Sequence, residues 1–406
     1  MKPCAEHVSS SEDCRHIVLH IITQFDRGGS ARDTFHTVMG HDRRRFRVGL
    51  VYGGTKGLTL AEAELVAADL KSLRQADVAL FEIPTLMREI RPLQDARATL
   101  ALWRLLRRER PSLVHTHTSK AGAVGRLAAW LARVPAVIHT PHGHVFYGYY
   151  GPVMSKLICL AERALAKITD RIVTLTDRGA QEHVQFKIAG PAKFVTIPSG
   201  VVLSTFRSLH VDPVLKRKAL GLPAEGPVVG TVGRLVPVKG HAWLLRSIPF
   251  VLTEFPAAHF VLVGDGPLRE ELTWLAEELG IGRHVTFLGT REDVPECLTA
   301  FDLFVFPSLN EGMGLALIEA MVLGLPVVAT TVGGIPDIVV DGETGTLVPP
   351  CDERALAAAL VGLLQDPHRR RMYGEAARRR VDKRFDVVSA VRAIEALYET
   401  VWHEKH

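Results

Sequence analysis

Two glutamates and two glycines lie close together in residues 306–321, where an apolar run gives way to an apolar helical pattern. Gly312 and Gly314 permit a tight turn there, and the expected helix begins just after Gly314. A helix N-terminus carries unpaired N–H groups and the positive end of the helix dipole, so it attracts an anion. Glu311 comes just before this end, and Glu319 lies about one turn inside it. Burying Glu319 costs free energy unless it binds a partner, so the segment predicts a binding site; the alternative is a paired core charge.

Cations and further glycines occupy two other junctions between an apolar run and a helical pattern. The run 228–232 is followed by Arg234 and Lys239, which can clamp a diphosphate, Arg as a bidentate fork and Lys as a point charge. Gly28 and Gly29 come at the start of the first helical pattern, an arrangement that cradles phosphate. The full G-x-G-x-x-G spacing is missing, so no dinucleotide fingerprint is present. Taken alone, the two cations are also compatible with a solvated surface.

Three histidines fall within six residues at 139–144, directly after an apolar run. Neither H-E-x-x-H nor a nearby cysteine accompanies them, so a strand-end loop with one active-site histidine, His142, is favoured over a metal site. His115, at the end of another apolar run, is compatible with a core position. The chain contains no D-x-D pair, which could chelate a cation against a diphosphate. We therefore expect a site that uses no metal and no other cofactor.

Apolar runs alternate with amphipathic helical patterns along the chain, which indicates parallel sheets covered by helices on both faces. The expected strands are 16–22, 47–52, 78–83, 112–115, 136–139, 171–175, 194–197, 228–232, 260–263, 285–288, 302–306 and 327–330. The expected helices begin near residue 31 and then cover 94–108, 122–132, 155–167, 241–254, 268–279, 315–323 and most of 352–402.

A Pro- and Gly-rich polar segment at 198–227 interrupts this alternation, which then starts again. The sequence therefore predicts an α/β fold of two Rossmann-like doubly wound domains that face a central cleft. Ligands bind beyond the carboxyl ends of the strands in such sheets. Residues 1–15 are expected to form a flexible tail, 16–205 the first domain and 206–385 the second, followed by a helix over 386–406.

Composition narrows the class of protein. The 406 residues are 47% hydrophobic and 23% charged, which excludes a disordered chain. No continuous apolar run of about 20 residues occurs, so no membrane-spanning helix is expected. The five cysteines show neither metal-binding nor disulfide spacing, which favours a reduced, cytoplasmic chain.

Positive charge is concentrated in residues 1–200, which hold 28 Lys and Arg against 18 Asp and Glu. Without an RNA-binding aromatic signature or zinc-finger spacing, no nucleic acid partner is expected. The helical pattern 103–110 places Trp103 and Leu106 on one side and its arginines largely off it, and aromatic residues follow at 146–150. These features suggest peripheral association with an anionic membrane, at the cytoplasmic face of the inner membrane. The alternatives are a helix packed on the sheet and tyrosines that line a ligand-binding groove.

These segments together resemble the GT4 family of retaining glycosyltransferases, which have the GT-B fold. The resemblance rests on Glu311-x7-Glu319 set in Pro-Ser-…-Glu-Gly-Met-Gly, with Gly-Arg-Leu-…-Lys-Gly at 233–240 and Val-Gly-Asp-Gly-Pro-Leu-Arg at 263–269. It covers most of the chain between residues 15 and 384. Residues 138–146 resemble members that build exopolysaccharide, O-antigen or lipid-linked oligosaccharide.

The resemblance implies a donor-binding role for five residues of the second domain. Arg234 and Lys239 would hold the donor diphosphate. The N–H groups of Gly314 and Leu315 would support the leaving phosphate, and Glu319 would bind the ribose hydroxyls. No metal would be needed, since cations and helix N–H groups can stabilise the charge that develops on the diphosphate.

The resemblance also implies catalytic roles for Glu311 and His142, both near the donor sugar. Gly28 and Gly29 would approach the diphosphate from the first domain, and the C-terminal helix would pack back onto that domain. Two departures from the family pattern occur. Residues 198–202 read Pro-Ser-Gly-Val-Val instead of Pro-Asn-Gly-Val-Asp, and Arg32 replaces the acid that often follows the Gly-Gly pair.

The implied function is transfer of a hexose or N-acetylhexosamine, with retention, from a nucleotide-diphosphate sugar. UDP is the favoured nucleotide, and the acceptor is a lipid-linked glycan or a saccharide of a cell-surface polysaccharide. Same-fold alternatives are a sugar-nucleotide epimerase and a non-catalytic nucleotide-sugar-binding partner subunit. The intact Glu311, Glu319, Arg234 and Lys239 argue against a subunit that has lost activity.

Overall fold

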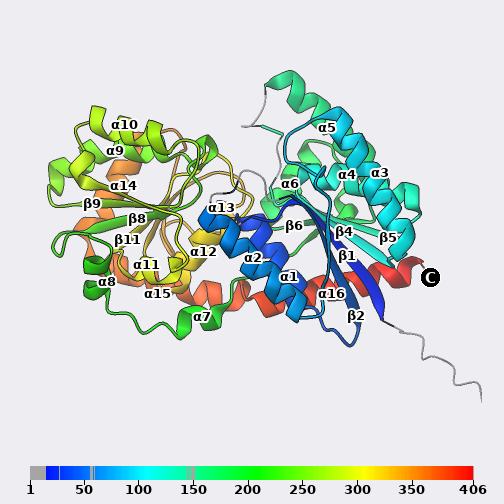
Figure 1. Cartoon of the computed structure of the whole chain (residues 1–406). Helices are drawn as coiled ribbons and strands as arrows, with labels where there is room; N and C mark the ends of the chain where they lie inside the picture. Colours follow the sequence, from blue (N-terminus) through cyan, green and yellow to red (C-terminus); the bar gives the residue numbers. More distant parts are fainter. Residues whose placement is uncertain are drawn as a thin grey trace, which may run out of the picture.

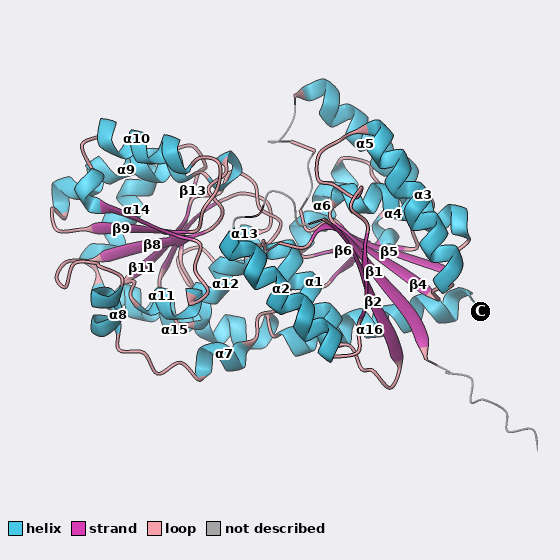
Figure 2. Cartoon of the chain, in the orientation of Figure 1, coloured by secondary structure: helices cyan, strands magenta, loops and turns pink. Residues whose placement is uncertain are grey.

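The computed structural model describes residues 15–26, 28–54, 58, 60–143, 146–147 and 151–405. They form two lobes, each built on one parallel sheet with helices on both of its faces (Figures 1 and 2). The tail expected at 1–15 lies outside the described residues except for residue 15.

The first domain contains a seven-stranded sheet in the order β3-β2-β1-β4-β5-β6-β7, and all its neighbouring pairs are parallel. Its strands are β1 (His16–Gln24), β2 (Phe46–Gly53), β3 (Ala79–Glu82), β4 (Leu113–His117), β5 (Ala136–Thr140), β6 (Arg171–Thr174) and β7 (Phe194–Thr196). Its helices are α1 (Gly29–Gly40), α2 (Leu60–Gln75), α3 (Pro92–Glu109), α4 (Ser119–Ala132), α5 (Pro152–Lys167), α6 (Asp177–Gln185) and the 3-10 turn η1 (Pro191–Lys193). The strand order reverses between β1 and β4, so a crevice opens at the carboxyl ends of these two strands.

The second domain repeats this plan with a six-stranded parallel sheet in the order β10-β9-β8-β11-β12-β13. Its strands are β8 (Val228–Val232), β9 (His259–Val263), β10 (Val285–Gly289), β11 (Leu303–Phe306), β12 (Val327–Thr330) and β13 (Thr346–Val348). Its helical segments are η2 (Pro237–Lys239), α9 (His241–Glu254), α10 (Arg269–Glu278), η3 (Gly282–His284), α11 (Val294–Thr299), α12 (Leu315–Val322), α13 (Ile335–Ile338), α14 (Glu353–Gln365) and α15 (Pro367–Arg384). Here the order reverses between β8 and β11, which gives a second crevice.

The central strands are apolar on both faces because helices cover both faces. All residues of β9, β11 and β12 are buried, as their predominantly apolar sequences predict. Two apolar clusters flank the second sheet, and two smaller clusters flank the first. The predicted α/β class and the two doubly wound domains are confirmed.

The chain passes between the domains twice, and the two passages lie side by side. The first passage carries two short helices, α7 (Leu203–Arg207) and α8 (Pro213–Ala219), where the sequence analysis expected only a Pro/Gly-rich boundary. Val201 accepts a hydrogen bond from the Val387 N–H (3.1 Å) and donates its own N–H to the Phe385 carbonyl (2.9 Å). A Cβ on Gly200 would lie 2.2 Å from the Val387 Cα, so only glycine permits this approach.

After the second passage, α16 (Val387–Lys405) runs along the first domain, as the red helix at the base of Figure 1 shows. Ile394, Leu397 and Val401 are buried in the apolar cluster that lies under β1 and β2. The last helix of the chain therefore completes the core of the first domain.

One expectation about α3 is wrong. Leu102, Leu105 and Leu106 are buried against the sheet, and the partly buried Trp103 packs on the same cluster. The helix therefore does not offer this side to a membrane, and the alternative of ordinary core packing holds. The aromatic segment at 146–150 is described only at Phe146 and Tyr147. Within the described ranges, no helix is both long enough and apolar enough to cross a bilayer.

Candidate active site

The two crevices open on one cavity of about 1490 Å³ between the domains. Its walls come from the loops after β1 and β4 on one side and after β8 and β11 on the other. All nine site residues predicted from the sequence line it: Gly28, Gly29, His142, Arg234, Lys239, Glu311, Gly314, Leu315 and Glu319. The structure thus brings together junctions that lie up to 290 residues apart in the sequence, since residues 29 and 319 both reach the cavity.

The turn before α12 presents the helix N-terminus to the cavity. Gly314 has a φ of 89°, a left-handed conformation that glycine adopts without strain, and a Cβ there would lie 2.9 Å from the Phe306 ring. α12 starts at Leu315, so its first N–H groups are available to an anion.

Glu319 is the buried carboxylate of α12, with 1% of its surface exposed. Its Oε1 lies 2.7 Å from a terminal nitrogen of Arg32 on α1, which makes an ion pair between the domains. The same oxygen has no hydrogen bond of good geometry within the described part of the chain. It therefore keeps acceptor capacity for a hydroxyl donor such as a ribose.

Lys239 and Glu311 form an ion pair across the cavity wall. The Lys239 ammonium also lies 5.2 Å from the centre of the Phe306 ring, which adds a cation–π contact. Arg234 is exposed at the cavity and has no ion-pair partner in the described ranges. The Arg234 guanidinium could therefore bind a diphosphate directly. The Lys239 ammonium could bind one by exchanging its ion pair with Glu311 for a pair with a phosphate oxygen.

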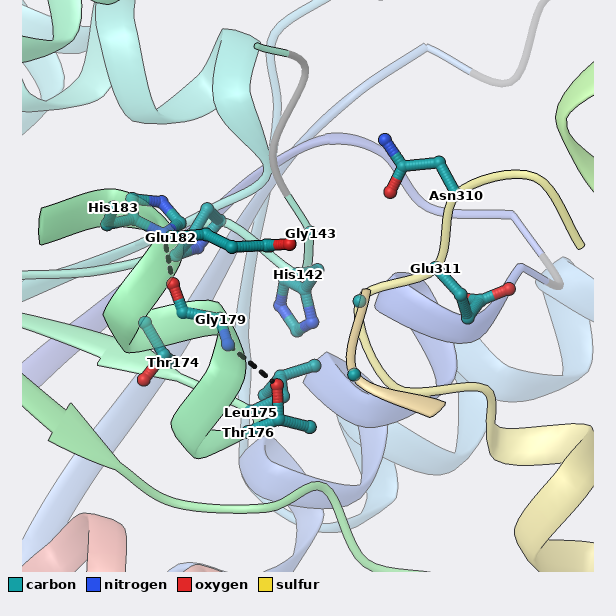
Figure 3. A pocket seen from close by; sticks show the side chains of 13 residues that line it. His142, Gly143, Thr174, Leu175, Thr176, Gly179, Glu182, His183, Asn310 and Glu311 are labelled. Carbon is teal, nitrogen blue, oxygen red and sulfur yellow. Dashed lines mark hydrogen bonds between the residues drawn. The ribbon is translucent and has the colours of Figure 1, made fainter. Parts of the chain in front are cut away.

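Backbone contacts across the cleft hold His142 against the loop that follows β11. A Cβ on Gly312 would lie 2.5 Å from the His142 carbonyl oxygen and 2.9 Å from the Gly143 nitrogen. The Asn310 side-chain amide donates to the Tyr147 carbonyl at 3.2 Å. Figure 3 shows His142 between α6 and this loop, next to a small pocket of about 20 Å³, while the Glu311 side chain points away from the histidine.

His142 follows β5 in a left-handed backbone conformation, with a φ of 57°. Its Nε2 lies 3.0 Å from Nδ1 of His117, and its Nδ1 lies 3.7 Å from Oδ2 of Asp33. Burial lowers the pKa of His142 to about 3, so the imidazole is neutral near pH 7. Burial also raises the pKa of Asp33 to about 6. Perturbed groups of this kind in a cleft are typical of a functional site.

Four cavity or near-cavity residues were not singled out as site residues by the sequence analysis: Arg32, Asp33, Asn310 and His117. Arg32 had a visible signal, because it stands where the resembling family has an acid. His117 also had one, since His115 and His117 alternate along a strand and so share one face of the sheet. Asp33 and Asn310 acquire their surroundings only from the packing of the two domains.

Two doubly wound domains with parallel sheets, and a cavity between them at both strand-order reversals, define the GT-B fold. The family models agree with this class: residues 27–205 match Glycosyltransferase Family 4, and residues 226–366 match Glycosyl transferases group 1. The chain belongs to glycosyltransferase family 4, and the predicted family, fold and enzyme class are confirmed.

Individual relatives support the same assignment. The chain is 34% identical over 324 residues to the Escherichia coli UDP-Gal:alpha-D-GlcNAc-diphosphoundecaprenol alpha-1,3-galactosyltransferase, over 79% of this chain and 84% of that one. It is 35% identical over 272 residues to the D-inositol 3-phosphate glycosyltransferase of Mycobacterium marinum, over 62% of this chain but only 55% of that longer protein. Among solved structures, Anabaena Alr3699/HepE in complex with UDP and glucose superposes with a TM-score of 0.79 at 23% identity, over 95% of this chain and all of that one.

Proposed function

We propose that this glycosyltransferase moves a hexose or N-acetylhexosamine from a UDP-sugar to a lipid-diphosphate-linked saccharide, with retention, during synthesis of a cell-surface polysaccharide. The observation that carries the proposal is the cavity itself, which is lined by Arg234, Lys239, Glu311 and Glu319 from the second domain and by apolar side chains of α4 and α5 from the first. The name of the Escherichia coli relative specifies a UDP-sugar donor and a diphosphoundecaprenol-linked acceptor, and this supports the assignment.

The part of the cavity lined by the second domain fits the donor. Arg234 and Lys239 would pair with the diphosphate, helped by the N–H groups at Gly314 and Leu315, while Glu319 would accept from the ribose hydroxyls. Release of Lys239 to the diphosphate would free Glu311 to accept from a sugar hydroxyl. These groups would stabilise the charge on the leaving UDP without a metal. Gly28 and Gly29 would close over the diphosphate from the first domain, and His142 would face the sugar.

The apolar part of the cavity lining fits an acceptor that carries a lipid. It comes from α4 and α5 and consists of Val124, Leu127, Ile158, Ala161 and Leu165. The first domain also lines the cavity with Arg88, which pairs with Asp26 at 3.2 Å, and with Lys120, which pairs with Asp95 at 2.5 Å. Cations and apolar side chains in one cavity suit a molecule that has both a diphosphate and a hydrocarbon chain.

The outer surface of α5 supports membrane attachment. Val153, Met154, Leu157 and Leu160 are exposed on this helix, and Trp130 and Leu131 are exposed on the neighbouring α4. Only Cys159 and Ala166 of α5 are buried. With Lys156 and Lys167 on the same helix, the surface combines apolar side chains and positive charge, as expected for a helix that rests in an anionic membrane.

Sedimentation with liposomes tests this attachment. Wild type should bind vesicles rich in anionic lipid, and salt should weaken the binding. The double variant Leu157→Glu/Leu160→Glu should lose at least about 10-fold in partitioning, because each leucine contributes roughly 1.5–3 kcal/mol when buried. The control Trp274→Glu changes an even more exposed apolar residue, which belongs to the second domain. Equal binding by all three proteins, or none by wild type at low salt, would exclude this surface as the membrane contact.

Donor and acceptor are tested separately. Thermal unfolding should shift upward with UDP and with at least one UDP-hexose, since a ligand that binds only the folded state stabilises it. The purified enzyme should then transfer that sugar to undecaprenyl-diphosphate-N-acetylglucosamine in the presence of EDTA. A requirement for magnesium or manganese would contradict the metal-free clamp, and transfer to a soluble saccharide alone would contradict the lipid-linked acceptor.

A further inference from the structure

A row of four buried histidines connects the active-site cavity with the C-terminal helix. Nε2 of His142 lies 3.0 Å from Nδ1 of His117, whose Nε2 lies 2.9 Å from Nδ1 of His20. Nε2 of His20 lies 3.1 Å from Nε2 of His41. The row ends at α16, where Nδ1 of His41 lies 3.2 Å from Oε1 of Glu395. We call these five residues, including Glu395, the histidine relay.

The sheet explains why these side chains meet. His20 on β1 is the register partner of His115 on β4, and His117 lies two residues further along the same face. His20, His41 and His117 have at most 3% of their surface exposed, and the His142 side chain has 5%. Buried polar groups in such number are costly unless each one is hydrogen-bonded.

Burial lowers the pKa of all four histidines of the relay, so each is a neutral imidazole with a single N–H. A neutral imidazole that donates on one side must accept on the other. The group at either end of the row therefore decides which nitrogen donates in every hydrogen bond along it.

Glu395 sets that direction. Its Oε1 also accepts the Asp42 N–H at 2.7 Å, and its Oε2 lies 3.3 Å from an Arg45 nitrogen. Burial alone would raise the pKa of Glu395, but these hydrogen bonds and the one from His41 outweigh it and lower the pKa. Glu395 is thus a carboxylate that accepts from His41, so the Nε2 atom of His41 accepts from His20.

The same alternation continues to the cavity: His20 accepts from His117, and His117 accepts from His142. We propose that Glu395, His41, His20 and His117 are positioning residues that hold His142 as the Nε2–H tautomer, with Nδ1 facing the cavity as the acceptor of a substrate hydroxyl. The 3.7 Å separation between Nδ1 of His142 and Oδ2 of Asp33 exceeds hydrogen-bond length, so no hydrogen bond to this carboxylate draws the proton to Nδ1. The inference rests on the proposed function only in that the substrate is a saccharide.

The charged and titratable groups that face the relay come from several elements. They are Asp33 on α1, Arg43 in the loop before β2, His115 on β4, His139 on β5, and Tyr398 on α16. His115 is itself fixed, because its two ring nitrogens meet the Tyr398 hydroxyl at 2.6 Å and the Thr140 hydroxyl at 2.7 Å.

A metal site is the competing use of this cluster. His20, His115 and His117 each bring a ring nitrogen within 4.8 Å of the others. A metal would have to displace the hydrogen bond between His20 and His117 or those of His115. Because the existing bonds already satisfy these nitrogens, the relay accounts for the cluster without an ion.

Nitrogen NMR of histidine-labelled, unliganded protein tests the tautomer directly. His142, assigned by comparison with His142→Gln, should carry its proton on Nε2, and His41 should carry it on Nδ1. A proton on Nδ1 of His142, or stoichiometric transition metal in the purified protein, would overturn the proposal. Because no substrate is present, this outcome is independent of which donor and acceptor the enzyme uses.

Variants of His41 test the consequence for turnover. His41→Gln keeps a donor for Glu395 and an acceptor for His20, whereas His41→Phe keeps neither. With a UDP-hexose that the enzyme turns over, His41→Phe should lower kcat on the order of 10-fold with little change in KM, which is less than the 10²-fold or more expected from loss of His142 itself. His41→Gln should restore kcat to within about 3-fold of wild type.

His259 supplies the matched control, as a buried histidine of the second domain that contacts Thr286 at 2.8 Å. His259→Phe should leave kcat and the His142 spectrum unaltered. Equal losses in folded His41→Gln and His41→Phe would show that the relay does not act through tautomer selection. Should His41→Phe fail to fold, the wild-type spectrum and His41→Gln still decide the question.

Discussion

At the scale of single residues, charged side chains of opposite sign in the cavity are paired with one another. Lys239 pairs with Glu311, and Arg32 pairs with Glu319, so each carboxylate that we assign to the donor already has a cation. Pairing of these charges avoids the cost of isolated buried ions. The donor must therefore exchange these ion pairs for its own contacts, and this exchange makes individual substitutions informative.

Lys239→Ala should reduce kcat/KM for the UDP-sugar by about 30- to 150-fold. The variant loses a charge-assisted bond to the diphosphate, worth roughly 2–3 kcal/mol in a desolvated site, and leaves Glu311 without its cation. Initial rates at saturating acceptor measure the effect. Lys216→Ala is the control, because Lys216 also forms a half-buried ion pair, with Asp293 at 2.5 Å, but does not line the cavity. A wild-type rate for Lys239→Ala would refute the clamp.

The buried carboxyl group of Asp33 should make the free energy of unfolding fall as the pH rises. Burial raises its pKa from 3.8 to about 6, so the folded state binds more protons than the unfolded state between these values, and stability falls as the pH rises through them. Asn does not titrate, so the stability of Asp33→Asn relative to wild type should increase by roughly 2.4 kcal/mol between pH 4 and pH 7.

Urea unfolding at the two pH values measures this difference for Asp33. Glu225→Gln, at an exposed carboxylate, controls for the loss of one negative charge. A stability difference that stays constant between pH 4 and pH 7 would show that Asp33 is not strained by burial in the folded state.

At the scale of elements, the sequence predicted what local periodicity encodes. The apolar runs at 228–232 and 327–330 are strands with those bounds, and the helices over 241–254 and 315–323 agree within a residue. β13 was not predicted, because its three residues, 346–348, are too few to show a period. The short helices α7 and α8 were also missed, since a Pro- and Gly-rich composition resembles a loop.

The candidate site was predictable to the same extent. Glycines, cations and acids at the strand-to-helix junctions are local signals, and the structure gathers them in one cavity. His20, His41 and Glu395 carried no local signal, because they meet only when β1, the segment after α1, and α16 pack together. Long-range packing of this kind leaves no spacing in the sequence.

The docking of α16 on the first domain gives a prediction at this scale. Leu397→Ala should lower the free energy of unfolding by about 2–4 kcal/mol, because the side chain is buried in the cluster under β1 and β2 and its loss leaves a cavity. Val388→Ala on the same helix is the control, since Val388 is exposed and should change stability by less than about 0.5 kcal/mol. Equal effects of both substitutions on urea unfolding would contradict the docking.

At the scale of the whole molecule, the groups that we assign to the reaction and their neighbours are divided between the two domains. His142 and Asp33 belong to the first domain, while Lys239 and Glu311 belong to the second. The double passage of the chain at Gly200 and Val387 ties the domains on one side, and the contact of Gly312 with the His142 segment joins them across the cleft. Catalysis should therefore depend on this closure more strongly than nucleotide binding does.

Gly312→Ala tests that separation. Its added Cβ would lie 2.5 Å from the His142 carbonyl oxygen and 2.9 Å from the Gly143 nitrogen, so these two backbone segments, one from each domain, must separate. We expect kcat to fall by about 10²-fold or more, since a displacement near 1 Å of reacting groups costs that much. The Kd of UDP, measured by calorimetry, should change by less than about 5-fold, because the proposed nucleotide contacts lie mostly within the second domain.

Gly362→Ala is the control, as no atom lies within 4 Å of the added methyl group. Parallel losses of UDP binding and turnover in Gly312→Ala would show instead that the loop around Glu311 is itself disrupted, and that closure is not what the glycine serves.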